Sequence, residues 1–157
     1  MRAWFKTGFN FGLSSGVITT LGLMVGLFAG THSKEVVLGG IVTIAFADAF
    51  SDAFGIHVSQ ESLDHLSHNE VWLATITTFF TKLVFALSFV VPILLFSLPV
   101  AMVVSLAWAL LLIVSANVVI ARGERLSILR VVGEHLLFAF LVIVVTYYVG
   151  TFVDTLF

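Results

Sequence analysis

The chain has no cysteine, only two prolines and very few charged residues. Without cysteine it has no disulfide, no thiolate metal ligand, no iron–sulfur cluster and no cysteine nucleophile. Charged residues make up 10% of the 157 residues and hydrophobic residues 60%, which excludes a soluble domain or a soluble enzyme. Seven basic against nine acidic residues leave no basic patch for nucleic acid. The sequence therefore predicts a protein of the lipid bilayer.

Long apolar runs fill most of the chain. A helix needs about 20 apolar residues to cross the hydrocarbon core. Pro92 and Pro99 bracket a tight reversal between two of the runs. We expect an all-α, polytopic fold that forms a single transmembrane domain over residues 1–157. Its five membrane-spanning helices are predicted at 7–31, 36–58, 72–96, 100–120 and 127–153.

The basic residues predict how the chain sits in the membrane. Five spans place the two termini on opposite sides. Lys34 is alone on one side, and the other side holds Arg2, Lys6, Arg122, Arg125 and Arg130. The positive-inside rule then puts the N terminus in the cytoplasm and the C terminus opposite. Lys82, about two turns into the third span, is interpreted as an anchor whose long stem snorkels toward the head groups.

The first predicted span carries glycines spaced by four. They are Gly8, Gly12 and Gly16, followed by Gly22, Gly26 and Gly30. All six lie on one helical face, which lets another backbone approach closely in lipid. Ordinary packing within the chain explains such a face. The alternatives are a narrow path lined by this face, or contact with its own copy. We expect a homodimer with this face near the two-fold axis.

Two carboxylates interrupt the second span. Asp48 lies near its middle, and Asp52 follows one helical turn later on the same face. Two carboxylates about 6 Å apart in a low dielectric cannot comfortably both be ionised, so they should share a proton or a cation. This requirement is typical of proton-coupled cation transport. The structural alternative is a protonated pair hydrogen-bonded to a neighbouring helix, for which Asn10, Ser14, Ser15 and Asn117 are available.

The segment after the second span carries four possible metal ligands. Glu61, Asp64, His65 and His68 follow an i, i+3, i+4, i+7 pattern, so they share one face if the helix continues beyond the membrane. Oxygen and imidazole ligands suit Fe²⁺, Mn²⁺ or Zn²⁺. We expect a cytosolic capture site that feeds Asp52. A solvated helix end is the alternative.

The last span offers weaker candidates. Arg130 and Glu134 are spaced for an ion pair at the membrane interface, and Tyr148 continues their face as a possible hydroxyl donor in a path. Glu134 and Asn10 are also assigned to this path. The sequence has no His-Glu-x-x-His zinc motif and no convincing serine–histidine pair, so we expect no enzyme and no resident cofactor.

Three segments together resemble the vacuolar iron transporter and nodulin-like family. They are FGLSSGVITTLGL at 11–23, AFS at 49–51 with Gly55, and VTYYVG at 145–150. The order of five spans and the place of Pro92 also fit. The resemblance covers nearly the whole chain. It implies a homodimer that exports Fe²⁺ or Mn²⁺ from the cytosol in exchange for protons, along a path between protomers.

The chain departs from that family at its membrane acids. Ser15 stands where the family carries aspartate in the first span, and Ile44 where it carries an acid in the second. Asp52 stands at the family's methionine, and Asp48 at a small residue. We therefore expect a relocated metal site of Ser15, Asp48 and Asp52, whose oxygen donors favour Mn²⁺. The alternative function is a non-transporting membrane scaffold or assembly protein that keeps the fold.

Overall fold

A computed structural model of the chain describes residues 3–63 and 65–156. Within these residues the structure is all-helical, as predicted. The helices are α1 (Ala3–Thr31), α2 (Lys34–Glu61), α3 (His68–Ser88), α4 (Val90–Leu95), α5 (Leu98–Gly123) and α6 (Ile128–Leu156). α3 and α4 form one span, so five helical segments are long and apolar enough to cross a membrane. The predicted five-span fold is confirmed.

Polar caps explain why several helices extend about one turn past their apolar runs. Ser33 caps α2 by accepting a hydrogen bond from the Val36 N–H. Ser67 and Glu70 form a reciprocal capping box at the start of α3. Pro99 lies in the first turn of α5, where its missing N–H removes no helical hydrogen bond. Capping residues are polar, so a boundary drawn at the end of the apolar run falls short of the helix.

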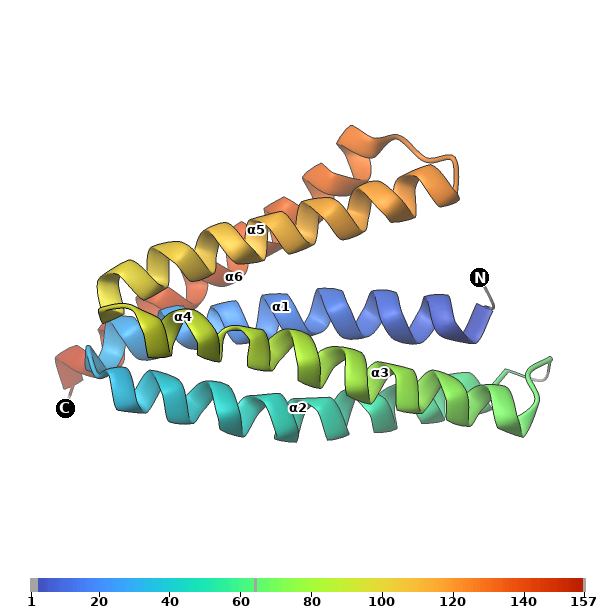
Figure 1. The fold of residues 1–157 in the computed structure, drawn as a ribbon, viewed down its shortest axis with the longest axis horizontal. Coiled ribbons are helices and arrows are strands. Elements are labelled where there is room, and N and C mark those ends of the chain that lie inside the picture. The colour runs from blue at the N-terminus through green and yellow to red at the C-terminus, as the bar shows by residue number, and fades with distance from the viewer. Residues whose placement is uncertain (1–2, 64, 157) are drawn as a thin grey trace.

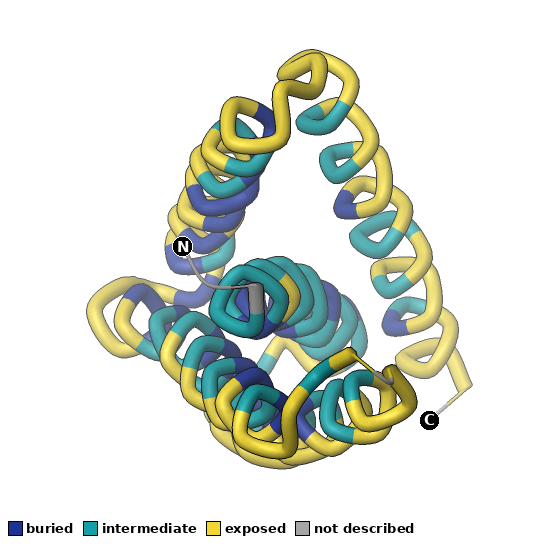
Figure 2. Tube along the Cα trace, turned by 90° about the vertical axis from the view of Figure 1, so that its right-hand side faces the viewer, coloured by how far each residue is buried: buried dark blue, intermediate teal, exposed yellow. Residues whose placement is uncertain are grey.

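α1 is the central helix of the bundle. It packs against α2, α3, α5 and α6, and the end-on view in Figure 2 shows it surrounded by the other helices. Its side chains Leu13, Val17, Leu21 and Met24 are buried in the core. α1 begins at one end of the bundle and α6 ends at the other, while α5 and α6 splay away near the start of α1 (Figure 1). Termini at opposite ends agree with an odd number of spans.

The glycine face of α1 is filled by the chain itself, which corrects the expectation that it meets a second copy. A Cβ added at Gly8 or Gly12 would lie 2.6 Å from the Ala74 carbonyl oxygen or 2.8 Å from that of Thr78, both on α3. In the other half of α1, a Cβ at Gly30 would lie 3.0 Å from the Gly150 carbonyl oxygen of α6. α3 and α6 thus share this face at different depths. The prediction was wrong because glycine spacing marks close packing without naming the partner.

A second row of small residues is exposed on α2. It comprises Gly39, Thr43, Ala47, Ser51, Gly55 and Ser59, all spaced by four and all exposed. A Cβ added at Gly39 or Gly55 would meet nothing within 4 Å. The buried residues of α2, such as Ala45 and Ala49, lie on the opposite side of the helix. We call this row the α2 small-residue stripe.

Candidate functional site

A buried charge cluster joins α1, α2 and α3 near the middle of the bundle. Lys82 of α3 forms ion pairs with both Asp48 and Asp52 of α2, and the Nζ to Asp48 Oδ2 distance is 2.5 Å. The Lys82 ammonium also donates a hydrogen bond to Ser15 Oγ of α1 at 2.9 Å. Ser15 Oγ in turn donates to Asp52 Oδ2 at 2.6 Å. Ser15, Asp48 and Asp52 therefore meet, as expected from the sequence, but they meet around a lysine.

Lys82 is not the snorkelling anchor that the sequence suggested. Its side chain is only 1% exposed. α3 begins at His68, one turn earlier than predicted, so Lys82 lies about 21 Å along the helix from that end. Its ammonium is instead paired with Asp48 and Asp52 inside the bundle. The capping box formed by Ser67 and Glu70 is the signal that places this start and was overlooked.

Gly16 allows Lys82 to approach α1 so closely. A Cβ added at Gly16 would lie 3.1 Å from the Lys82 carbonyl oxygen and 3.2 Å from Lys82 Cγ. Because α1 has no side chain at this point, the α3 backbone passes directly beside it. Ser15, the next residue along α1, then lies within hydrogen-bond distance of the ammonium. The glycine and the serine of α1 together determine where the lysine sits.

The cluster carries an excess of negative charge. Two carboxylates and one ammonium leave one negative charge when all three groups are ionised. An uncompensated charge in hydrocarbon is expensive. The side chains of Asp48 and Asp52 also keep 22% and 21% of their surface exposed, so the cluster is reachable from outside the protomer. The arrangement can therefore accept one further positive charge, carried by a proton or by a metal ion.

The other residues assigned to a path are not near this cluster. Asn10 lines a separate cavity between α1, α3 and α5. Glu134 is exposed and pairs with Arg130 at 3.1 Å, which is the interfacial ion pair that their spacing predicted. Tyr148 is 68% exposed on the outside of α6. Asn117 is buried on α5, where its side-chain amide donates to the Ile113 carbonyl oxygen.

Three of the four expected ligands of the capture site, Glu61, His65 and His68, do not share a helical face. α2 ends at Glu61 and His68 begins α3, so the helix on which the spacing depends is interrupted. Asp64 lies outside the described residues. His65 is exposed in the connecting turn. In the part of the chain that the structure describes, no three histidine, aspartate or glutamate side chains lie close enough together to hold a metal ion.

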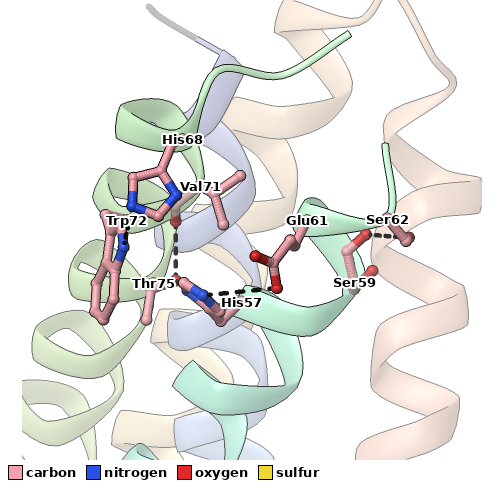
Figure 3. A network of polar contacts seen from close by, with 8 residues as sticks. All are labelled: His57, Ser59, Glu61, Ser62, His68, Val71, Trp72 and Thr75. Carbon is pink, nitrogen blue, oxygen red and sulfur yellow. Dashed lines mark hydrogen bonds and ion pairs between the residues drawn. The ribbon is translucent and has the colours of Figure 1, made fainter. Parts of the chain in front are cut away.

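Glu61 and His68 instead belong to a contact network between the ends of α2 and α3. His57 Nδ1 lies 3.0 Å from Thr75 Oγ1, and His57 Nε2 lies 4.0 Å from Glu61 (Figure 3). His68 Nε2 accepts a hydrogen bond from Trp72 Nε1 at 3.0 Å. The His57 ring packs edge-on against Trp72. This network joins α2 to α3 at the loop end of the bundle.

No protein family, no characterised protein and no solved structure gives a significant match to this chain. The resemblance to vacuolar iron transporters accordingly stays a prediction.

Proposed function

We propose that this chain is a proton-coupled transporter of divalent transition-metal cations, Fe²⁺ or Mn²⁺, with Asp48, Asp52 and Ser15 as the membrane ion site. The observation that carries the proposal is the convergence of these three oxygen-bearing side chains, from two helices, on the Lys82 ammonium. A positive charge already occupies the position that a transported cation would take. The site is therefore built to hold a cation.

Charge balance supports coupling to protons. With its excess negative charge, the empty site is neutral only when it has bound one proton. A divalent ion bound by both carboxylates takes the place of that proton, brings the cluster to one net positive charge and repels the ammonium. Metal binding and proton binding compete for the same oxygens, which is the requirement for exchange of one for the other.

The donor atoms favour a hard cation. Carboxylate and hydroxyl oxygens suit Mn²⁺, and an oxygen-ligated Mn²⁺ takes about six ligands. One protomer offers only Asp48, Asp52 and Ser15 among its described residues. Water or a second copy must supply the remaining ligands. Export from the cytosol is what the family resemblance implies, and the distribution of basic residues supports only a cytosolic N terminus.

Metal flux into proteoliposomes under an imposed pH gradient tests this function. The wild-type chain should carry Mn²⁺ or Fe²⁺ at a rate that increases with the gradient. Asp48→Asn should reduce this flux to the background of protein-free liposomes, because the variant loses both a ligand charge and a proton acceptor. Asp154→Asn removes an exposed carboxylate near the end of α6 and should leave the flux unchanged. Wild-type flux from folded Asp48→Asn protein would overturn the proposal.

The second candidate is a scaffold without transport. It is favoured by the pairing of Lys82 with both carboxylates, because such a cluster can also serve only to join three helices. The two functions differ in the wild-type chain itself. If reconstituted wild-type protein carries neither Fe²⁺ nor Mn²⁺ under any pH gradient, the scaffold is the better description.

We further propose a homodimer that forms through the α2 small-residue stripe. Ser51 and Gly55 in the stripe are exposed beside Asp48 and Asp52. In lipid, small residues let two helices approach and gain dispersion contacts. A second copy on this face would cover the open edges of the carboxylates and bring two ion sites together. This supports a path near the two-fold axis, along α2 in place of α1.

Disulfide crosslinking tests this interface directly, because the chain has no natural cysteine. Ala47→Cys and Ser51→Cys should each give a covalent dimer in membranes, since crosslinked Cα atoms lie about 4.4–6.8 Å apart. Val145→Cys, at an exposed position of α6, should stay monomeric under the same oxidation. Crosslinking at Val145 with none at positions 47 and 51 would move the interface to another helix.

A further inference from the structure

The cavity that Asn10 lines opens near the start of α1, away from the charge cluster. It has a volume of about 470 Å³ and lies between α1, α3 and α5. Sites for small molecules typically measure about 300–1,000 Å³ and are mostly apolar. The walls are largely apolar, and Phe9 and Phe85 meet edge-on across them at a centroid distance of 6.2 Å. Its size and its apolar walls make the cavity suited to hold a ligand.

The mouth of the cavity is polar. Lys6, in the first turns of α1, pairs at 2.8 Å with Glu124, which caps the end of α5. The hydrogen bond and the charge of Lys6 lower the pKa of Glu124, so the mouth presents one ammonium and one carboxylate at neutral pH. Both side chains are about half exposed, at 43% and 53%. The pair is therefore accessible to an outside group that carries both charges.

Asn10 adds an unused polar group one turn deeper. Its side chain lines the cavity and makes no hydrogen bond to the described residues. Below it the walls are apolar, with Leu13 from α1 and Leu112 from α5. Polarity thus decreases from an ion pair, through a free carboxamide, to hydrocarbon. This is the order of polarity along a phospholipid from head group to acyl chain.

We propose that this cavity binds one phospholipid whose head group carries a phosphate and a primary ammonium. The phosphate pairs with Lys6, the ammonium pairs with Glu124, and an ester oxygen of the glycerol region accepts a hydrogen bond from the Asn10 amide N–H. One acyl chain fills the space between Phe9, Phe85 and Leu112. A lipid with an anionic head group and no ammonium would leave the Glu124 carboxylate without a partner and repel it, so charge complementarity selects the zwitterion. The site is independent of the ion cluster and of metal transport.

Native mass spectrometry of the full chain tests the site. The purified protein is equilibrated in detergent with equal amounts of phosphatidylethanolamine and phosphatidylglycerol. One phosphatidylethanolamine per protomer should be retained, with a preference of about tenfold or more, as a charge-assisted hydrogen bond provides. Equal retention of the two lipids would overturn the proposal, because it indicates an unspecific lipid shell.

Two variants and one control variant locate the bound lipid. Ala116→Phe fills the cavity and should abolish retention, while Ala107→Phe places the same side chain at an exposed position of α5 outside the cavity and should retain the lipid. Glu124→Gln alters only an exposed side chain, so it should fold normally, and should remove the preference for phosphatidylethanolamine. Unchanged retention in Ala116→Phe, or an unchanged preference in Glu124→Gln, would place the lipid elsewhere.

Discussion

Two neighbouring helices carry rows of small residues, and the two rows have opposite surroundings. On α1 every glycine of the row lies against α3 or α6 of the same chain. On α2 the small residues are exposed, and Cβ atoms at Gly39 or Gly55 would meet nothing. In lipid no hydrophobic force drives helices together, so helices associate where small residues let their backbones approach closely. The α1 row makes such contacts within the chain, and the α2 row is available for contact with a second copy.

The difference also explains where the charges lie. Asp48 and Asp52 project from α2 beside its bare row, and Lys82 reaches them because Gly16 of the filled row admits the α3 backbone. One side of the cluster is thus tightly packed and the other is open. The packed side keeps Lys82 buried, and the open side leaves 22% and 21% of the Asp48 and Asp52 side chains exposed.

Removing Lys82, on the packed side of the cluster, should cause the largest loss of stability among these predictions. Lys82→Met leaves two carboxylates without a countercharge, and breaking a buried ion pair in this way costs about 3–5 kcal/mol. Thermal unfolding of the purified protein in detergent measures the loss. Lys34→Met removes an ammonium that is bonded only to the Phe96 carbonyl oxygen near the bundle end, and should change stability by less than about 1 kcal/mol.

A compensating variant separates charge from shape in that experiment. Replacing Asp48 and Asp52 by asparagine together with Lys82→Met removes all three charges, so no ion is left unpaired. Most of the lost stability should return, since neutral replacements of buried ion pairs are often well tolerated. If the triple variant is as unstable as Lys82→Met alone, the packing of the lysine stem, and not its charge, holds α1, α2 and α3 together.

The sequence predicted the parts of this site whose signal is local. Five spans follow from apolar runs, and the need of Asp48 and Asp52 for a cation follows from two acids one turn apart in hydrocarbon. The identity of that cation was missed, because the pairing of Lys82 with Asp48 and Asp52 depends on how α1, α2 and α3 pack together. The expected face of Glu61 and His68 was lost because α2 ends at Glu61. Helix ends are set by caps, and those few polar residues decide which side chains meet.

A bulky residue should distinguish the two rows. Gly12→Leu drives a side chain into the Thr78 carbonyl oxygen and Thr81 of α3, and overpacking of this kind costs about 1–3 kcal/mol. Gly55→Leu meets open space, so it should leave the unfolding temperature of the detergent-solubilised monomer unchanged while weakening dimers in liposomes. Equal unfolding temperatures for the two variants would show that α1 packs less tightly against α3 than the structure indicates.

The smallest effect is expected on α6, which offers a matched pair of glycines in one helix. A Cβ at Gly150 would overlap the Gly26 carbonyl oxygen of α1, whereas a Cβ at Gly133 would meet nothing within 4 Å. Gly150→Ala should therefore destabilise the protein by about 1 kcal/mol, less than full overpacking, because α6 borders lipid and can shift outward. Gly133→Ala should instead leave stability unchanged or raise it by up to about 1 kcal/mol, since alanine restricts the unfolded chain and favours the helix. One assay of the unfolding midpoints of wild type and both variants measures the expected loss at Gly150 and the expected absence of a loss at Gly133. A loss of stability at position 133 equal to that at position 150 would mean that α6 has a second packing partner along its length. The contacts of Gly150 with Gly26 and Gly30 would then not be the main attachment of α6 to α1.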